Sequence, residues 1–262
     1  MTKTQICNMA MLKIGQAIFT DVDADGTVTA NKINAAYSPV LEEALTTGPQ
    51  KGWKFARRRN RISVDSSTAT AFADYSGTVT GTTSCTTSAV HGLASGDLVN
   101  ITDTTNYDGE YEVTVIDTTS FYFTADYVAD DATGTIKWTS DSYEYRFPLP
   151  TMLRLVSVTV GGAELTDWIR EGAYILTNQE SDELDIQYVQ SITTESLFPP
   201  HFAKVFYMML AYHLSFDIVQ SKEHSNAVFE ELYGQVMPKA MALDEQEQYV
   251  EEESHSWVEA GR

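Results

Sequence analysis

The sequence predicts an α+β protein. Helices near both ends are expected to form a discontinuous helical bundle, with a central antiparallel β part and an inserted small β-sandwich or barrel. Apolar residues follow helical spacing in roughly the first 45 residues and again after residue 198. Between about residues 66 and 142 the chain is rich in Thr, Ser, Val, Tyr and Gly and shows short alternating runs. Both groups of helices present an apolar face without a local partner, so we expect them to pack together.

The first 45 residues predict two helices joined by a polar loop. The first covers residues 4–15 and ends at a glycine. The second covers about residues 29–45 and contains Pro39, which is expected to kink or break it. The loop at residues 21–26 alternates aspartates as a calcium loop does. Because Lys32 stands where such a loop needs its last glutamate, a solvated turn is favoured.

Residues 66–142 predict the inserted module. Short strands are expected at residues 78–82, 98–102, 111–116, 121–125 and 134–138. Turn-forming clusters rich in Gly, Asp and Asn separate several of them. Several short strands at this spacing are typical of a small β-sandwich or barrel.

The rest of the chain predicts more strands and then two helices. Residues 153–160 lead into Gly161-Gly162, a hairpin turn by composition, and further strands are expected at residues 174–177 and 184–189. A helix over residues 201–219 is apolar nearly all round and should be buried, and another follows over about residues 223–243. We therefore divide the chain into a scaffold (residues 1–65 and 143–262), a module (66–142) and an acidic C-terminal tail or arm (244–262).

Composition limits the possible functions. The formal net charge of −20 argues against a general nucleic-acid clamp and against docking on an anionic membrane. No stretch is expected to reach the ~18 apolar residues of a membrane span, and the N-terminus lacks the unbroken apolar core of a signal peptide. The two cysteines, Cys7 and Cys85, are expected to be free thiols in a reducing compartment. These features indicate no membrane partner and synthesis in a cytoplasm.

Motifs that support catalysis are missing from the sequence. The five histidines form no pair at metal-binding spacing, and there is no nucleophile elbow or glycine-rich phosphate loop. Cys85 lies six residues before His91, but this spacing alone is a weak sign of a nucleophilic dyad. We therefore predict no catalytic, metal or cofactor-binding residues, no cofactor and no enzymatic activity.

The sharpest electrostatic feature is residues 51–61, which hold six of the 17 basic residues of this acidic chain. Arginine pairs with carboxylates and phosphates alike. Three interpretations are therefore open: docking on a neighbouring subunit, contact with DNA, and ion pairs within the chain; subunit contact is favoured over DNA. Trp53 is expected to anchor the segment to the helical core, and Trp257 belongs either to a solvated end or to an arm that orders on a partner. The candidate partner or subunit interface is Lys51, Trp53, Lys54, Arg57, Arg58, Arg59, Arg61 and Trp257.

Several short segments, spread over roughly 185 residues, together resemble a known protein family. They are Ile-Cys-Asn-Met-Ala-Met-Leu-Lys-Ile-Gly at 6–15, Tyr37 with Leu-Glu-Glu-Ala-Leu at 41–45, Trp-Lys-Phe-Ala-Arg-Arg at 53–58, Tyr-Arg-Phe-Pro-Leu-Pro at 145–150 with Leu-Arg-Leu at 153–155, Glu-Gly-Ala-Tyr-Ile-Leu-Thr at 171–177, Leu-Asp-Ile-Gln-Tyr at 184–188 and Phe-Pro-Pro-His-Phe at 198–202. In their order and spacing they resemble the tail tubular protein A family, the head–tail adaptors (connectors) of short-tailed bacteriophages.

The resemblance implies a structural virion protein at the head–tail junction. Such a protein forms a homo-oligomeric ring, a dodecamer, between the portal protein and the tail nozzle protein, with a channel for DNA ejection. Double-stranded DNA would pass through the lumen without specific binding, and an acidic lining is expected to repel it. Residues 66–142 depart from the simplest family pattern and look like small β modules of phage tail proteins, so tail fibres are a further candidate partner.

A second function is left open by the sequence: a receptor- or glycan-binding tail component that uses the inserted module. It depends on aromatic residues expected to be exposed there, namely Tyr107, Tyr111, Tyr122 and Tyr127. Domain order argues against it, because a fibre tip usually ends in its binding module, whereas this module interrupts a helical scaffold.

Overall fold

The computed structural model describes residues 1–140 and 142–247. Helices and strands occur together in it, and six strands close into an antiparallel barrel, so the predicted α+β class with a small barrel is confirmed. The chain divides into two compact units. We call the first the helical unit (residues 1–58, 152–156 and from 188 onward) and the second the β unit (residues 59–151 and 157–187).

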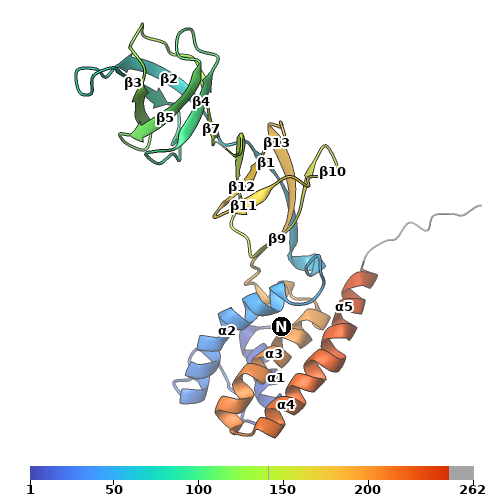
Figure 1. Cartoon of the computed structure of the whole chain (residues 1–262). Coiled ribbons are helices and arrows are strands. Elements are labelled where there is room, and N and C mark those ends of the chain that lie inside the picture. Colours follow the sequence, from blue (N-terminus) through green and yellow to red (C-terminus); the bar gives the residue numbers. More distant parts are fainter. Residues whose placement is uncertain (141, 248–262) are drawn as a thin grey trace, which may run out of the picture. The chain divides into compact units, whose positions relative to one another are not determined.

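In the described part of the helical unit, the α-helices pack around one core, with α3 in contact with the other four (Figure 1). They are α1 (Lys3–Lys13), α2 (Val28–Thr46), α3 (Pro200–Val219), α4 (Lys222–Glu231) and α5 (Met237–Gln246), with short 3-10 turns η1 (Lys54–Ala56) and η2 (Glu195–Leu197). Phe202, Phe206 and Met209 of α3 are completely buried. This core brings residues 3–46 together with residues 200–246.

The ends of these helices follow local signals. Thr2 and Gln5 form a reciprocal capping box at the start of α1. Pro200 occupies the first turn of α3, where a missing N–H costs nothing. Pro39 lies within α2, but the helix runs on past it, so the expected break is wrong. Proline removes one backbone hydrogen bond there, and buried apolar residues on both sides of it hold the helix against the core.

α3 also corrects an expectation about membranes. By length and composition alone, Pro200–Val219 is long and apolar enough to cross a membrane, contrary to the prediction that no stretch would be. More than half of its apolar window is buried among the other helices. The core helix of a globular protein passes the same test, and the burial of α3 accounts for its composition.

The predicted helix over residues 223–243 is observed as two helices joined by a π-helical turn, η3 (Leu232–Val236). Pro238 lies just after this turn and has no N–H to donate to the carbonyl four residues earlier. A widened turn accommodates such a gap in the backbone ladder. It also sets which face of α5 is buried, namely the face carrying Met237, Ala240 and Asp244.

The barrel is contained in residues 66–139, within the predicted module. Its strands are β2 (Ser66–Asp74), β3 (Thr82–Thr87), β4 (Leu98–Thr102), β5 (Gly109–Val115), β6 (Ser120–Thr124) and β7 (Thr135–Thr139), closed in the order β2-β3-β6-β5-β4-β7 (Figure 1). A bulge near Thr70 lets β2 pair first with β7 and then with β3. Inside, Phe72 stacks on Tyr107 at 4.7 Å between ring centroids.

Two of the predicted barrel elements differ from the structure. The strand expected at residues 78–82 is a turn, because the N–H groups of Thr78 and Val79 both donate to the carbonyl of Tyr75. Gly81 then takes a positive φ of 72°, and β3 begins after it. β2 was not predicted, since its Ser, Thr and Ala residues show little apolar alternation.

Asp131 ties loops together at one end of the barrel. Its carboxylate accepts hydrogen bonds from the Thr133 hydroxyl (2.6 Å), the Thr133 N–H (2.9 Å) and the Thr105 N–H (2.7 Å). These bonds, that of the hydroxyl first, lower the pKa of Asp131 from 3.8 to about 2. Because the folded-state pKa lies below the ordinary value, this stabilisation is present above about pH 4 and is lost as the pH falls toward 2.

We expect Asp131→Asn to lower the stability of the barrel at neutral pH and to flatten its dependence on pH between 4 and 2. Near-UV circular dichroism during acid titration measures this. Asp126→Asn, on the segment that follows β6, is the matched control and should keep the parent profile. An Asp131→Asn protein with the same acid transition as the parent would show that these hydrogen bonds do not stabilise the barrel.

The remaining strands form two small sheets in the centre of the sequence. One has the order β1-β13-β9-β10, with β1 (Arg57–Ser63), β13 (Glu183–Val189), β9 (Arg154–Val160) and β10 (Ala163–Glu164); the other has the order β11-β12-β8, with β11 (Ile169–Glu171), β12 (Tyr174–Thr177) and β8 (Tyr145–Pro148). The hairpin predicted at Gly161-Gly162 is confirmed: β9 and β10 pair across it, and both glycines have positive φ, 57° and 86°.

Arg146 on β8 is a buried cation inside the β unit. Its Nε donates to Asp65 Oδ2 at 2.7 Å, and its Nη1 lies 3.8 Å from Asp97 Oδ2. The guanidinium carbon lies 4.8 Å from the ring centroid of Trp138 and 4.4 Å from that of Tyr174. Arg146 thus ties β8 and β12 to residues that flank or belong to the barrel strands β2, β4 and β7.

The two units differ from the predicted division of the chain. The prediction grouped residues 143–262 with the N-terminal helices, whereas most of the central strands cluster with the barrel. The predicted tail begins inside α5, where Asp244 is 1% exposed. Residues 248–262 of that tail lie outside the described part of the chain.

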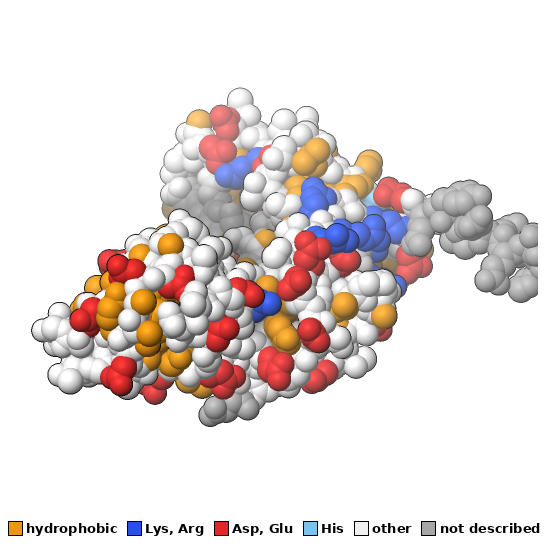
Figure 2. Space-filling view, turned by 90° about the horizontal axis from the view of Figure 1, so that it is seen from above, with side chains coloured by type: hydrophobic (Ala, Val, Ile, Leu, Met, Phe, Trp, Pro, Cys, Tyr) orange, Lys and Arg blue, Asp and Glu red, His pale blue; other side chains and the backbone are white. Residues whose placement is uncertain are grey.

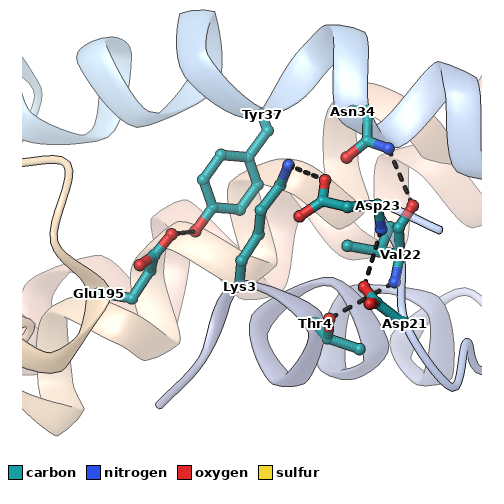
Figure 3. A network of polar contacts seen from close by, with 8 residues as sticks. All are labelled: Lys3, Thr4, Asp21, Val22, Asp23, Asn34, Tyr37 and Glu195. Atoms are coloured by element: carbon teal, nitrogen blue, oxygen red, sulfur yellow. Dashed lines mark hydrogen bonds and ion pairs between the residues drawn. The ribbon is translucent and has the colours of Figure 1, made fainter.

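The aspartate loop before α2 is held by contacts within the protein (Figure 3). Asp23 forms an ion pair with Lys3, whose Nζ also lies 5.2 Å from the ring centroid of Tyr37. The carboxylate of Asp21 accepts the N–H of Asp23 at 3.1 Å. Tyr37 in turn donates to Glu195 at 3.2 Å. These carboxylates bind groups of the protein itself, in agreement with the turn that the sequence predicted for residues 21–26.

Candidate interface on the central sheet

The basic segment enters the fold as η1 followed by β1. In the sheet order β1 is an edge strand, paired on one side with β13. Hydrogen bonds that flank the two strands, from the N–H of Gln190 to the carbonyl of Ala56 and from the N–H of Val64 to the carbonyl of Asp182, show that they run antiparallel. In this antiparallel register, the numbers of two opposite residues sum to 246, so Arg61 lies opposite Asp185.

Alternation gives this sheet one apolar and one polar face. Ile62, Val158 and Ile186 are buried on the apolar side. On the other side the sheet carries an open groove of about 630 Å³. We call it the β1 groove; it is lined by Arg59, Asn60, Arg61, Ser157, Thr159, Asp185, Ile186 and Gln187.

The two arginines of the β1 groove are in different electrostatic states. Arg61 is neutralised: its Nε donates to Asp185 Oδ1 at 3.0 Å and its Nη1 lies 3.3 Å from Glu183 Oε2. The hydrogen bond and charge of Asp185, aided by Glu183, raise the pKa of Arg61 above its ordinary value. Arg59 instead faces the neutral Gln187, and among the described residues it has no carboxylate within 4 Å. The groove therefore has one cation already paired and one available.

β1 also has an unpaired edge, on the side of the strand that faces away from β13. Because the flanking hydrogen bonds pair even-numbered residues of β1 with β13, the N–H and C=O of Arg59 and Arg61 point away from β13. Within residues 1–140 and 142–247, no second strand pairs with β1. Such an edge offers hydrogen bonds to an added strand.

The root of the basic segment is anchored inside the helical unit. Trp53 is 0% exposed, and its Nε1 donates to the carbonyls of Ala44 and Thr47 at 2.8 and 3.0 Å. The prediction that it anchors the segment to the helical core is confirmed. Trp53 therefore presents no surface of its own to a partner in the single chain, and the interface itself stays a prediction.

Lys54 is held beside α5. Its N–H donates to both carboxylate oxygens of Asp244, at 3.1 and 3.3 Å, and its Nζ donates to the carbonyl of Glu245 at 2.7 Å. The buried carboxylate thus fixes the start of η1 to the C-terminal helix. These contacts give Lys54 a role within the chain.

The other predicted interface residues lie near the surface. Lys51, Arg58 and Arg59 are exposed and Arg57 is partly so. Arg58 donates from Nη1 to the carbonyls of Phe55 and Arg57, at 3.1 and 2.9 Å. Trp257 lies outside the described residues. Ion pairs within the chain therefore account for the charge of Arg61. Among the described residues, no carboxylate pairs with Arg57, Arg58 or Arg59.

Basic side chains are scarce on this acidic protein. On the face in Figure 2, Lys and Arg side chains are few and several lie together, whereas Asp and Glu side chains are spread widely. An acidic protein that keeps unpaired arginines on a strand edge has a local site for anionic groups.

The structure also places the residues considered for catalysis. Burial raises the pKa of the Cys85 thiol to about 12, which disfavours the nucleophilic thiolate. His91 uses both ring nitrogens on the backbone: Nε2 lies 3.0 Å from the Asp117 carbonyl, and Nδ1 accepts the N–H of Leu93. Within the described residues, no three His, Cys, Asp or Glu side chains gather as a metal site would require.

Sequence reasoning missed the acidic and neutral partners of β1. Asp185 and Gln187 were expected only as parts of a strand, and Asp244 as part of a tail. The alternation of polar and apolar residues in 183–189 gave a signal for the two faces of β13, but nothing local identified β1 as its neighbour. No protein-family model matches this chain, and no curated protein matches it either.

Proposed function

We propose that this chain is the head-to-tail adaptor of a short-tailed bacteriophage. It would form a ring of twelve copies, seated between portal and tail nozzle at the head–tail junction of the virion, after synthesis in the host cytoplasm. Its role would be structural, without catalysis. The proposal draws on the resemblance to the tail tubular protein A family, whose segments come from both ends and the centre of the chain.

The observation that carries the proposal is the surface of the helical unit. Its helices share a well-filled core, yet Met9 and Leu12 of α1, Phe216 of α3 and Phe229 of α4 are exposed. Tyr212 packs against Phe229 at 5.3 Å between ring centroids and extends that apolar surface. Apolar side chains exposed on several helices are suited to cover by neighbouring subunits in a ring, where two different surfaces of each copy meet.

The finer architecture follows from the same proposal. The helices would form the discontinuous bundle of the adaptor scaffold, with the central strands completing it and the closed barrel inserted as an accessory module. The barrel has no free sheet edge in its closed strand order, so contacts with tail fibres or neighbouring subunits would use its loops.

Charge is consistent with a channel for DNA. Twelve copies at −20 each give the assembled ring a large negative charge. An acidic lumen repels DNA and keeps it from adhering in transit. DNA is thus a passing cargo in this proposal, and specific nucleic-acid contacts are not required.

Burial of aromatic residues weakens the alternative function, a receptor- or glycan-binding component. Tyr107 is buried in the barrel core, where its hydroxyl donates to the carbonyl of Ala129 at 2.7 Å. Tyr111, Tyr122 and Tyr127 are partly buried. The exposed aromatic platform on which that alternative depended is therefore reduced, and we favour the adaptor.

Mass measurement of the purified protein, alone and mixed with its portal ring, tests the proposal. We expect a complex with twelve copies of this chain on each portal ring. Phe216→Ser should weaken its formation at least tenfold, because it removes exposed apolar surface from α3. Val79→Ser on an exposed barrel loop is the matched control. A persistent monomer that does not bind portal rings would contradict the adaptor function.

A further inference from the structure

Among the described residues, β1 presents an arginine without a carboxylate partner beside an unpaired strand edge. Arg59 faces Gln187, while the neighbouring Arg61 is already paired with Asp185 and Glu183. The outward N–H and C=O groups of β1 lie beside the same arginines. An extended chain that places a negative charge opposite Arg59 satisfies both features.

Charge selects among possible strands. A second β1 is a poor partner, because its own arginines would lie opposite these ones; basic residues on an edge strand act against such pairing. DNA is a poor ligand as well. Binding to a phosphate backbone needs a broad basic surface, whereas this chain has a net charge of −20 and Arg61 is already paired with two carboxylates. An acidic peptide strand needs only one or two cations in addition to the backbone bonds.

The sequence contains one segment with the required pattern. Residues 249–253 read Tyr-Val-Glu-Glu-Glu, in which a β-branched and an aromatic residue precede the acidic run. In an extended strand, Glu251 and Glu253 lie on the same face, about 7 Å apart. On β1, Arg61 is already paired with Asp185 and Glu183, so one of these glutamates would meet Arg59. This segment lies outside the described residues, and its negative charge complements Arg59.

We propose that the unpaired edge of β1, beside Arg59, binds the acidic segment 249–253 of a second copy of this chain as an added strand. Arg59 would pair with a glutamate of the incoming strand, and the outward backbone groups of Arg59 and Arg61 would supply the hydrogen bonds. The inference rests on the proposed function only in regarding the second copy as the neighbour in a ring; the edge of β1 and its ligand are defined without it.

Binding of a labelled synthetic peptide of residues 245–262 to the full chain tests the proposal. The acceptor carries E251Q, E252Q and E253Q, so that its own segment competes weakly. We expect saturable binding, measured by fluorescence anisotropy, that weakens at least tenfold in the Arg59→Glu acceptor and at high salt. Arg170→Glu, an exposed arginine of β11, is the matched control and should bind as the parent does.

Two further peptides separate charge from strand addition. A peptide with lysine at positions 251, 252 and 253 should bind the Arg59→Glu acceptor better than the parent acceptor. A peptide with proline at position 252 keeps two glutamates but disrupts strand pairing, and it should lose binding. Equal binding of the proline peptide, or an Arg59→Glu acceptor that binds like the parent, would overturn the proposal.

The outcomes separate this inference from the adaptor function. Peptide binding by a chain that never assembles with portal rings would reject the adaptor function and support strand addition at β1. Ring assembly on the portal by a chain that does not bind the peptide would reject strand addition at β1 and support the adaptor function.

Discussion

Replacing Arg146 with alanine is expected to lower the free energy of unfolding of the β unit by about 3 kcal/mol, because it leaves Asp65 without its cation in a largely buried position. The Arg146 side chain is 8% exposed and that of Asp65 is 22% exposed. Partial solvation of Asp65 keeps the loss at the lower end of the range for broken buried pairs. The stacking of the guanidinium between Trp138 and Tyr174 is lost as well.

Hydrogen exchange of the amides in β7 and β8, measured at increasing urea concentration, gives the effect of this substitution on the free energy of unfolding. Arg146→Lys should recover less than half of the loss, since an ammonium group cannot both pair with Asp65 and stack on two rings. Arg170→Ala, exposed on β11, should change stability by no more than about 0.5 kcal/mol. A lysine variant as stable as the parent would show that charge alone explains this site.

Replacing Trp53 with alanine is expected to destabilise the helical unit by about 4 kcal/mol. The indole packs edge-on against Phe202 at 5.5 Å and donates to two carbonyls at the end of α2. Those carbonyls have no partner within the helix, so the indole caps it. Gly48 shows how tightly the ring fits: a Cβ on this residue would lie 2.7 Å from Trp53 Cζ2.

Urea unfolding followed by the helical circular dichroism signal measures the Trp53 effect. Trp53→Phe keeps a ring but removes the N–H and should cost less than the alanine substitution. Leu12→Ala, on an α1 side chain that is 59% exposed, is the control and should change stability by at most about 0.5 kcal/mol in the isolated protein. If Trp53→Ala unfolds at the same urea concentration as the parent, Trp53 does not anchor the basic segment.

Much of the fold could be predicted from local pattern. Alternation located β4, β9, β12 and β13, and helical spacing located α1, α2 and α3. β2 was missed because its Ser, Thr and Ala residues belong to a barrel in which a bulge divides its partners. The π-helical turn was missed because it depends on how Pro238 fits the packing of two helices, which spacing alone does not reveal.

Less of the candidate site could be predicted. The basic run was evident, but the distinction between Arg59 and Arg61 depends on the register of β1 against β13, whose residues lie more than 120 positions apart. Such pairings are set by the tertiary fold. The burial of Asp244 likewise depends on η1 reaching α5, so an acidic residue near the end of the chain looked like part of a tail.

The distribution of the two cores along the chain has a consequence for folding during translation. The barrel strands occupy one continuous stretch, so the ribosome releases everything the barrel needs before residue 200 is made. The helical core is different. The apolar faces of α1 and α2 stay uncovered until α3, which begins at Pro200, has been synthesised. Until then those faces are the part of the nascent chain most exposed to chaperones. Conditions that stall synthesis late should therefore release chains with a finished barrel and an unfinished helical core.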